Sequence, residues 1–306
     1  MRAFCTIITK SHLPWAAALN RSLEKFDPKM RVVVLVVDST GPFEEYRIKF
    51  PNTSFICLDE IANDKVAERI LVKYKNDLDL LRWTLKPVLL KYLLLHYSKV
   101  IYVDSDLFFF GDYNFLFGYL DDSSIILTPH WRASRLRDDR KNFYLNFEEG
   151  LYNAGFIGVN RNSMPALDFW AESCLDSCTR NSFRGQLHDQ SYLNLFPIFF
   201  DKVQIVKHRG CNVANWNILE CKRTLSASGT VVINDEFPIV FIHFTQSTIT
   251  GIFAGNDVLL SDCLSEYIDV LKEFRGDKEI DMTKKRSLFK ILNRVFESIH
   301  NFLRSL

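Results

Sequence analysis

The sequence predicts an α/β fold in which a Rossmann-like, mostly parallel central sheet carries helices on both faces. Short apolar runs alternate with longer segments of helical spacing from residue 3 onward, which is the order expected of βαβ units. The apolar runs are nearly continuous, as in strands that are buried on both faces. With 306 residues and no low-complexity linker, the chain fits one large domain with a C-terminal appendage.

The first half of the chain opens as a βαβ unit. We expect a strand at 3–9, a helix at 15–26 and a second strand at 31–37, with a further short strand at 55–58. A long apolar helix at 83–97 then leads into a strand at 100–103. These elements supply the core of a parallel sheet.

The second half continues the pattern around one polar segment. Residues 132–141 are predicted to form a loop or lid, because they are polar and lack periodicity. Helices are expected at 164–178 and 257–274, and sheet-like apolar runs at 125–128, 155–160, 203–206, 231–233 and 240–244. We therefore assign residues 1–275 to one domain and 276–306 to a separate tail.

The tail reads as an amphipathic helix with a basic polar face. Apolar residues recur at helical spacing from residue 288 to residue 306. Its only acidic residue after position 283 is Glu297, and its basic residues are Lys284, Lys285, Arg286, Lys290, Arg294 and Arg304. Such a helix is typical of an anchor on an anionic membrane surface. Packing on its own domain or on a second subunit is the alternative.

Composition excludes several classes of protein. Lys and Arg number 38 against 37 for Asp and Glu, so no overall basic field predicts a nucleic-acid partner. Cys5 and Cys57 lie in strand-like runs, as free thiols in a reducing cytosol do. Cys174 and Cys178 lack a second matching pair, so packing is favoured over a zinc site. Without an apparent signal peptide or spanning segment, we expect a cytoplasmic protein on the inner face of the membrane.

The most informative run is Val100–Val103, because it leads directly to Asp104 and Asp106. The carboxyl end of a strand is the edge at which open α/β sheets bind ligands. Carboxylates suit Mg²⁺ or Mn²⁺, which keep positions open for substrate phosphates. The same spacing at Asp77 and Asp79 lies in a polar stretch typical of a solvated helix face. A strand-to-loop turn capped by aspartates is the alternative for the first pair.

Four segments carry a resemblance to a known family: 100–106, 152–156 (Tyr-Asn-Ala-Gly-Phe), 188–190 (His-Asp-Gln) and 241–244 (Phe-Ile-His-Phe). In this order and spacing the chain resembles family 8 glycosyltransferases and their bacterial relatives over about residues 3–250. The resemblance implies a GT-A fold, Mn²⁺ (or Mg²⁺), a nucleotide-sugar donor such as a UDP-hexose, and a saccharide or lipid-linked saccharide acceptor. Residues 212–217 (Asn-Val-Ala-Asn-Trp-Asn) also look like a segment of poorly characterised bacterial sugar transferases.

The resemblance assigns roles to matching residues. Asp104 and Asp106 correspond to the metal carboxylates, with Ser105 between them in the donor site, and His243 corresponds to the histidine that completes the metal shell. An imidazole beside two carboxylates favours Mn²⁺ over Ca²⁺. For His243, burial as an ordinary core histidine is the alternative.

The sugar and nucleotide positions are implied in the same way. Asn153 and Ala154 correspond to the floor under the donor sugar, and Asp189 and Gln190 to the pair beside the anomeric carbon. For that pair, capping of the helix that follows is the alternative. The remaining donor-site candidates are Thr9, Ser11, Asp38 and Lys86. Lys86 is either a ligand of phosphate or sugar oxygens, or a surface lysine before Pro87.

The chain departs from the family after the His-Phe motif, where a diphosphate-binding lysine is expected and residues 245–250 read Thr-Gln-Ser-Thr-Ile-Thr. Candidate replacements are Ser247, Thr248, Lys207, His208 and Arg209. The family implies transfer with retention of configuration. An inverting enzyme requires a general base, for which the candidates are Asp138, Asp139 and Glu148.

Two other classes stay open. A haloacid-dehalogenase-like phosphatase also delivers two aspartates on a strand, and its later Gly-Asp pattern has a counterpart at residues 276–281. A protein that binds nucleotide-sugars without turnover is compatible with the missing lysine.

Overall fold

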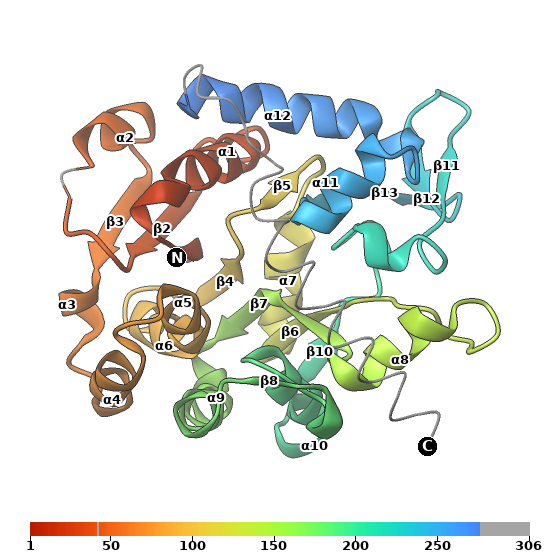
Figure 1. Ribbon diagram of the computed structural model, residues 1–306. Helices are drawn as coiled ribbons and strands as arrows, with labels where there is room; N and C mark the ends of the chain where they lie inside the picture. Colours follow the sequence, from red (N-terminus) through yellow and green to blue (C-terminus); the bar gives the residue numbers. More distant parts are fainter. Residues whose placement is uncertain (42, 276–306) are drawn as a thin grey trace. The chain divides into compact units, whose positions relative to one another are not determined.

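A seven-stranded sheet forms the centre of the described part of the chain in the computed structural model, which describes residues 1–41 and 43–275 (Figure 1). The strand order is β10-β6-β7-β4-β1-β2-β3. Strand β7 is antiparallel to β4 and β6, and the other neighbouring pairs are parallel. The bounds are β1 (Arg2–Ile8), β2 (Arg31–Val36), β3 (Thr53–Cys57), β4 (Lys99–Val103), β6 (Ile125–Pro129), β7 (Tyr152–Asn160) and β10 (Val203–Ile205). The predicted α/β class with a mostly parallel sheet is confirmed.

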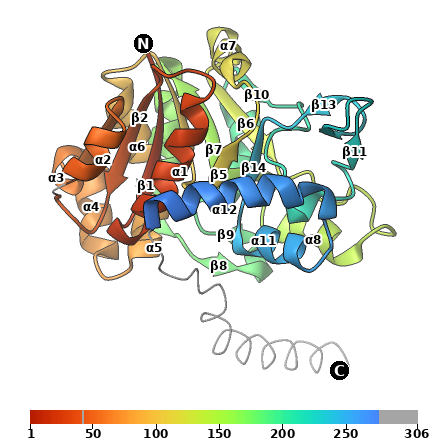
Figure 2. The same cartoon turned by 90° about the horizontal axis from the view of Figure 1, so that it is seen from above.

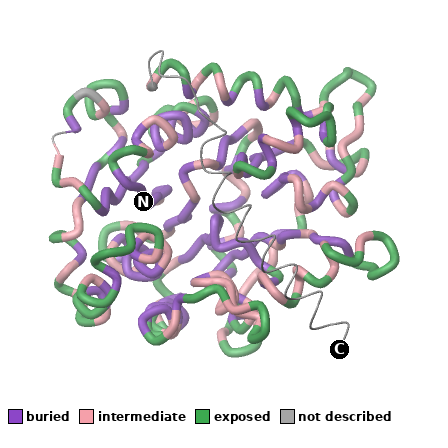
Figure 3. Tube along the Cα trace, in the orientation of Figure 1, coloured by how far each residue is buried: buried purple, intermediate pink, exposed green. Residues whose placement is uncertain are grey.

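Helices cover both faces of this sheet, because alternate strand residues point to opposite sides. On one face, Cys5 and Ile7 of β1 belong to a core with α4 (Lys65–Tyr74), α5 (Leu78–Thr84), α6 (Lys86–Leu94) and α9 (Met164–Asp176). On the other face, Phe4 and Ile8 join a core with α1 (Leu13–Glu24) and α7 (Asn114–Asp122). Figure 3 colours the buried residues of these strands and helices purple.

Smaller elements complete the fold. Strand β5 (Leu107–Phe109) pairs with β14 (Phe241–His243), β8 (Arg180–Asn181) with β9 (Gln186–Leu187), and β12 (Val231–Ile233) lies between β11 (Arg223–Leu225) and β13 (Phe237–Pro238). The other helices are α2 (Glu44–Lys49), α3 (Leu58–Ile61), α8 (Arg140–Glu148), α10 (Phe196–Phe199), α11 (Gln246–Phe253) and α12 (Ser261–Arg275). Helix α12 runs beside α1 (Figure 2), and Lys25 at the end of α1 pairs with Glu266.

Four predicted elements differ from those observed. The helix expected at 83–97 is two helices, because Pro87 occupies the first turn of α6, where its missing N–H is tolerated. The runs at 231–233 and 240–244 lie outside the central sheet, in β12 and β14. The predicted loop at 132–141 ends early, because the Asp139 side chain accepts from Asn142 N and caps α8.

Other expectations meet different outcomes. All seven cysteines, which lie among the described residues, are free thiols, as predicted for Cys5 and Cys57. Within the described ranges, no helix combines the length and apolarity needed to cross a bilayer. The predicted tail helix at 284–306 and the pattern at 276–281 lie outside the described residues.

Candidate metal and donor site

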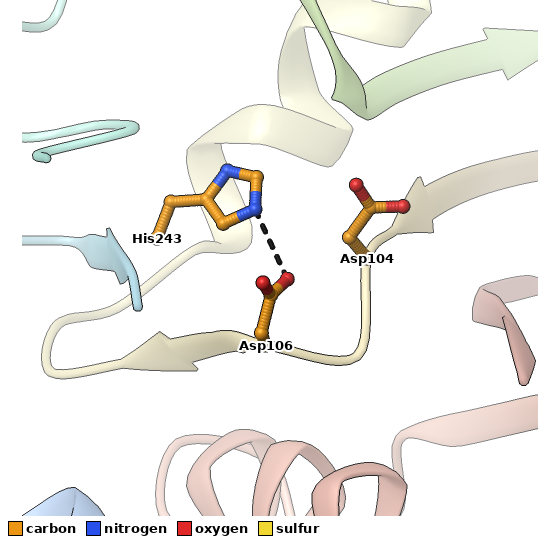
Figure 4. A group of neighbouring side chains, drawn as sticks. All are labelled: Asp104, Asp106 and His243. Carbon is orange, nitrogen blue, oxygen red and sulfur yellow. Dashed lines mark ion pairs between the residues drawn. The ribbon is translucent and has the colours of Figure 1, made fainter. Parts of the chain in front are cut away.

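Asp104, Asp106 and His243 converge at the carboxyl end of β4 (Figure 4). One potential ligand atom from each lies within 4.8 Å of the others. His243 Nε2 is 3.0 Å from Asp106 Oδ1. Two carboxylates and an imidazole form a donor set that suits Mn²⁺ or Mg²⁺, so these residues fit the metal that the sequence predicts.

Two short strands bring these distant residues together. After β4 the chain makes a tight turn, in which Leu107 N donates to Asp104 O at 3.1 Å, and then enters β5. Strand β14 runs antiparallel to β5 with His243 opposite Leu107. Phe244 N donates to Asp106 O at 2.9 Å. The β5–β14 pair therefore fixes His243 beside the two carboxylates.

Asp104 is held by a buried tyrosine on the same strand. Tyr102 Oη donates to Asp104 Oδ1 at 2.8 Å, and the two residues share a face because side chains alternate along a strand. Burial raises the pKa of Tyr102 well above its usual range. The phenol therefore stays protonated and acts as a donor to the carboxylate.

Lys86 lies in the interior, which overturns the surface alternative. Its side chain is 4% exposed, and Nζ is 3.1 Å from Asp189 Oδ2 and 3.5 Å from Asp104 Oδ1. It also donates to Ala154 O at 3.1 Å. Burial acts to lower the pKa of Lys86, but the negative charges of Asp104 and Asp189 outweigh it and raise the pKa. Burial raises the pKa of Asp189, against the opposing effect of Lys86.

The buried ring of His243 pairs with the half-buried carboxylate of Asp106. Burial acts to lower the pKa of His243, but the charge of Asp106 outweighs it and raises the pKa. Burial acts to raise the pKa of Asp106, but His243 outweighs it and lowers the pKa, with a smaller contribution from His12. On the far side of the ring, Asn153 Nδ2 lies 3.2 Å from His243 Nδ1. The ring is thus held from both nitrogens.

Gly155 has no side chain, and the space beside it is filled by the side chains of Asn153, Asp104 and His243. Its N–H donates to Asn153 Oδ1 at 2.6 Å. A Cβ at this position would lie 2.7 Å from Asn153 Oδ1, Asp104 Oδ2 and His243 Cε1 alike. The glycine of the Asn-Ala-Gly motif is therefore a requirement of the site itself.

Asp189 lies beside Lys86, and Gln190 is bonded to β7, the strand that carries Asn153 and Ala154. Gln190 Oε1 accepts from Ala154 N at 3.1 Å, and its Nε2 donates to Glu149 O at 2.7 Å. Asp189 makes no side-chain cap to the 3₁₀ helix that follows. Its carboxylate is turned to Lys86, so the capping alternative is wrong for Asp189.

Thr9, Ser11 and Asp38 gather at the ends of two neighbouring parallel strands. Thr9 Oγ1 is 2.9 Å from Ser11 Oγ and 2.6 Å from His12 Nδ1. Lys10 N donates to Asp38 Oδ1 at 2.6 Å. Because β1 lies beside β4 in parallel, these residues share the sheet edge with Asp104. Ser105, between the metal carboxylates, is buried.

Most of the residues that could replace the expected diphosphate-binding lysine make other contacts. Thr248 is buried, and its hydroxyl donates to Asn215 Oδ1 at 3.1 Å. Lys207 Nζ and Arg209 Cζ lie 5.3 and 3.4 Å from the centre of the Trp131 ring. Ser247 is exposed in the first turn of α11, and His208 packs against Phe115 and Phe237.

The candidate bases of an inverting reaction lie around α8. Asp139 is occupied as its N-cap. Asp138 is exposed and 3.8 Å from Arg137, and Glu148 is half-buried at the end of the helix.

Sequence reasoning missed Tyr102, His12 and Trp216, whose ring lies 5.4 Å from that of His243. Tyr102 was accessible from the sequence, because it lies two residues before Asp104 on the same strand face. His12 directly follows the candidate Ser11, and Trp216 lies in the segment 212–217, but the sequence pattern assigns neither residue a role at the site.

Two proteins of Bacillus subtilis are similar to this chain in sequence. No family model matches the chain. It is 28% identical over 258 residues to YfnF of Bacillus subtilis strain 168, covering 82% of this chain and 83% of that protein, which is described as uncharacterized. It is 29% identical over 255 residues to YfnD of the same organism, also uncharacterized, covering 80% of this chain and 78% of that protein.

Solved structures show the fold. The galactosyltransferase LgtC, in a complex with donor and acceptor sugar analogs, superposes with a TM-score of 0.52 at 15% identity, covering 92% of this chain and 99% of LgtC. Mouse xyloside xylosyltransferase 1 superposes with a TM-score of 0.51 at 15% identity, covering 81% of this chain and 99% of that chain. The predicted GT-A fold, of the kind seen in family 8 enzymes, is confirmed.

Proposed function

We propose that this chain is a metal-dependent glycosyltransferase that moves a sugar, from a UDP-hexose, to a saccharide or lipid-linked saccharide. The observation that carries the proposal is the cluster of Asp104, Asp106 and His243 at the sheet edge of a GT-A fold. Open α/β sheets bind ligands at this edge. The GT-A neighbours are transferases of sugars by their names, which supports the same reaction class here.

In this proposal the three clustered side chains hold Mn²⁺ or Mg²⁺ with open positions for the diphosphate. A cation bound there neutralises the leaving group. Thr9, Ser11 and Asp38 contact the nucleoside at the ends of β1 and β2.

The sugar occupies the space beside Asp189. The buried Lys86–Asp189 pair offers charged hydrogen-bonding groups to sugar hydroxyls. Asn153 and Ala154 form the floor under the ring. Gln190, whose Oε1 retains a second lone pair beside the bond from Ala154 N, stabilises positive charge that develops at the anomeric carbon.

Transfer proceeds with retention in this proposal. The acceptor hydroxyl attacks the anomeric carbon on the face that the diphosphate leaves, the bond to the phosphate oxygen breaks, and the acceptor proton passes to that oxygen. No protein carboxylate is needed as a base, and Asp139 is already used as a helix cap. Proton NMR of the first-formed product would show the anomeric configuration of the donor, whereas the opposite configuration would contradict retention.

The function is tested with Asp106→Ala and a matched control, Asp79→Ala. Asp79 has the same spacing from Asp77 but lies exposed on α5, paired with Arg82. We expect Asp106→Ala to abolish Mn²⁺-stimulated hydrolysis across a panel of nucleotide-sugars while the fold persists, and Asp79→Ala to retain it. Undiminished hydrolysis in Asp106→Ala would contradict the metal role. Donor and Mn²⁺ binding without turnover would favour the non-catalytic alternative, and release of phosphate from simple phosphoesters the phosphatase.

We also propose that residues 284–306 bind the inner face of the cell membrane. The basic, amphipathic pattern of that segment supports this. Deleting it should weaken sedimentation with anionic vesicles and spare activity on a soluble acceptor. Sedimentation equal to that of the full chain would contradict the role of this segment.

A further inference from the structure

Helix α8 presents aromatic side chains to solvent beside the candidate donor site. None of its residues is buried. Arg140, Tyr144 and Phe147, at positions i, i+4 and i+7, form one exposed stripe, with Tyr144 and Phe147 exposed by 41% and 64%. A helix that merely faces water carries polar residues on that stripe. The exposed rings of α8 therefore indicate a binding surface.

A second exposed ring lies next to this stripe. Phe183, in the 3₁₀ turn η3 (Ser182–Arg184) of the β8–β9 hairpin, is 93% exposed. The turn contacts α8. A Cβ on Gly185 would lie 2.8 Å from Phe147 O. We call α8 with residues 180–185 the aromatic platform.

The platform and its approach are basic. Residues 131–149 and 180–185 contain four acidic residues. Only Asp138 is exposed, and the other three are half-buried. The exposed basic residues of these two described segments are Arg135, Arg137, Arg140, Lys141, Arg180 and Arg184. Aromatic rings combined with Lys and Arg are the side chains that settle at the boundary of an anionic bilayer.

Direct contacts join the platform to the candidate site. Glu149, the residue after α8, accepts at its carbonyl oxygen from Gln190 Nε2 at 2.7 Å. Its carboxylate pairs with Arg180 of the hairpin at 2.9 Å and with Arg132 at 2.5 Å. Residues 180–187 then lead directly to Asp189. A surface that binds the platform is thus held close to Gln190 and Asp189.

We propose that the aromatic platform inserts into the interface of an anionic phospholipid membrane and so holds the enzyme where a membrane-linked acceptor meets the donor. The inference of a lipid contact depends only on the aromatic platform. Its role in acceptor delivery rests on the proposed function. Tyr144, Phe147 and Phe183 enter the headgroup layer, and the exposed Arg and Lys side chains pair with lipid phosphates.

The test locates the contact on the full chain, because the C-terminal segment also bears on vesicle binding. Hydrogen–deuterium exchange is measured with and without vesicles of phosphatidylglycerol and phosphatidylcholine. We expect slower exchange in residues 140–149 and 180–185 when anionic vesicles are present. Unchanged exchange in both segments overturns the proposal. Slowing without vesicles as protein concentration rises also overturns it, because the platform then contacts a second copy. Equal slowing by pure phosphatidylcholine overturns the assignment to an anionic surface.

A triple variant, Tyr144→Ser with Phe147→Ser and Phe183→Ser, tests the rings themselves. We expect its partition onto anionic vesicles to fall at least about tenfold. The matched control replaces exposed apolar residues elsewhere, Val72→Ser with Phe253→Ser and Val258→Ser, and should partition like the parent chain. Equal partition of the triple variant and the parent overturns the proposal.

Soluble-donor hydrolysis separates this inference from the proposed function. We expect the triple variant to retain it, and its loss would overturn the lipid assignment by placing the rings in the donor site. Absence of hydrolysis in the parent chain would contradict the proposed function and leave the vesicle result intact.

Discussion

Replacing Gly155 with alanine tests whether the geometry of the metal site requires a residue without a side chain at position 155. The added Cβ would lie 2.7 Å from Asn153 Oδ1, Asp104 Oδ2 and His243 Cε1, where ordinary contact begins at 3.4 Å. Each neighbour must therefore yield by about 0.7 Å, since close-packed interiors offer little other room. All three are side-chain atoms, so the metal cluster distorts before the backbone does.

The size of the effect follows from metal geometry. Ligand distances in a metal site are tolerated to within about 0.2 Å, which is less than the required displacement. Disturbing the groups that orient ligands weakens metal affinity by about 10–100-fold. We therefore expect the Mn²⁺ dissociation constant of Gly155→Ala to rise at least tenfold. Overpacking should lower the free energy of unfolding by about 1–3 kcal/mol.

Two glycine variants serve as controls. Gly158→Ala, on the same strand, would meet Ile126 and Ile101 in the core; it should cost similar stability and leave Mn²⁺ affinity intact. Gly118→Ala in α7 has nothing within 4 Å and should stabilise the protein by about 0.5–1 kcal/mol. Isothermal titration with Mn²⁺ and urea unfolding measure both quantities. A Mn²⁺ affinity of Gly155→Ala equal to that of the parent chain would refute the reasoning.

Three further outcomes are expected. Tyr102→Phe removes the donor to Asp104 Oδ1 and should weaken Mn²⁺ binding about tenfold in titration, with stability lower by about 1 kcal/mol; unchanged affinity would contradict its positioning role. Burial, and next the charge of Arg132, hold the pKa of His130 well below 6.5. The unfolded chain then binds a proton that the folded chain does not, so stability is full above about pH 6.5 and falls by up to about 1.36 kcal/mol per pH unit below it. His130→Gln should reduce that slope in unfolding curves recorded at several pH values, and an identical slope would contradict the assignment. Asp64→Ala removes the cap of α4 and should cost about 0.5–2 kcal/mol in urea unfolding; a cost near zero would show that the cap is redundant.

The sequence was sufficient for most of the central strands. Buried parallel strands are continuous apolar runs, so 3–9, 31–37 and 125–128 lie within two residues of β1, β2 and β6. The antiparallel direction of β7 was not accessible, since an apolar run carries no mark of its direction. Its pairing with β4 and β6 is decided by tertiary packing.

The site was predictable as a set of residues but not as a set of contacts. The motif identified His243, yet the three-residue strand β5 that receives β14 is too short to recognise in a sequence. The sequence did not decide whether Lys86 is a ligand or a surface residue. Its burial depends on how α6 packs against β4 and on two distant carboxylates. The sequence pattern also does not decide which residue replaces the expected diphosphate-binding lysine, because that too depends on tertiary packing.

The cation site is tested most directly by crystals soaked in MnCl₂ and UDP, with data collected at the manganese absorption edge. We predict one strong anomalous peak bounded by Asp104, Asp106 and His243 Nε2, with density for the diphosphate on its open side. A map without a peak there, or with manganese bound only elsewhere, would contradict the account.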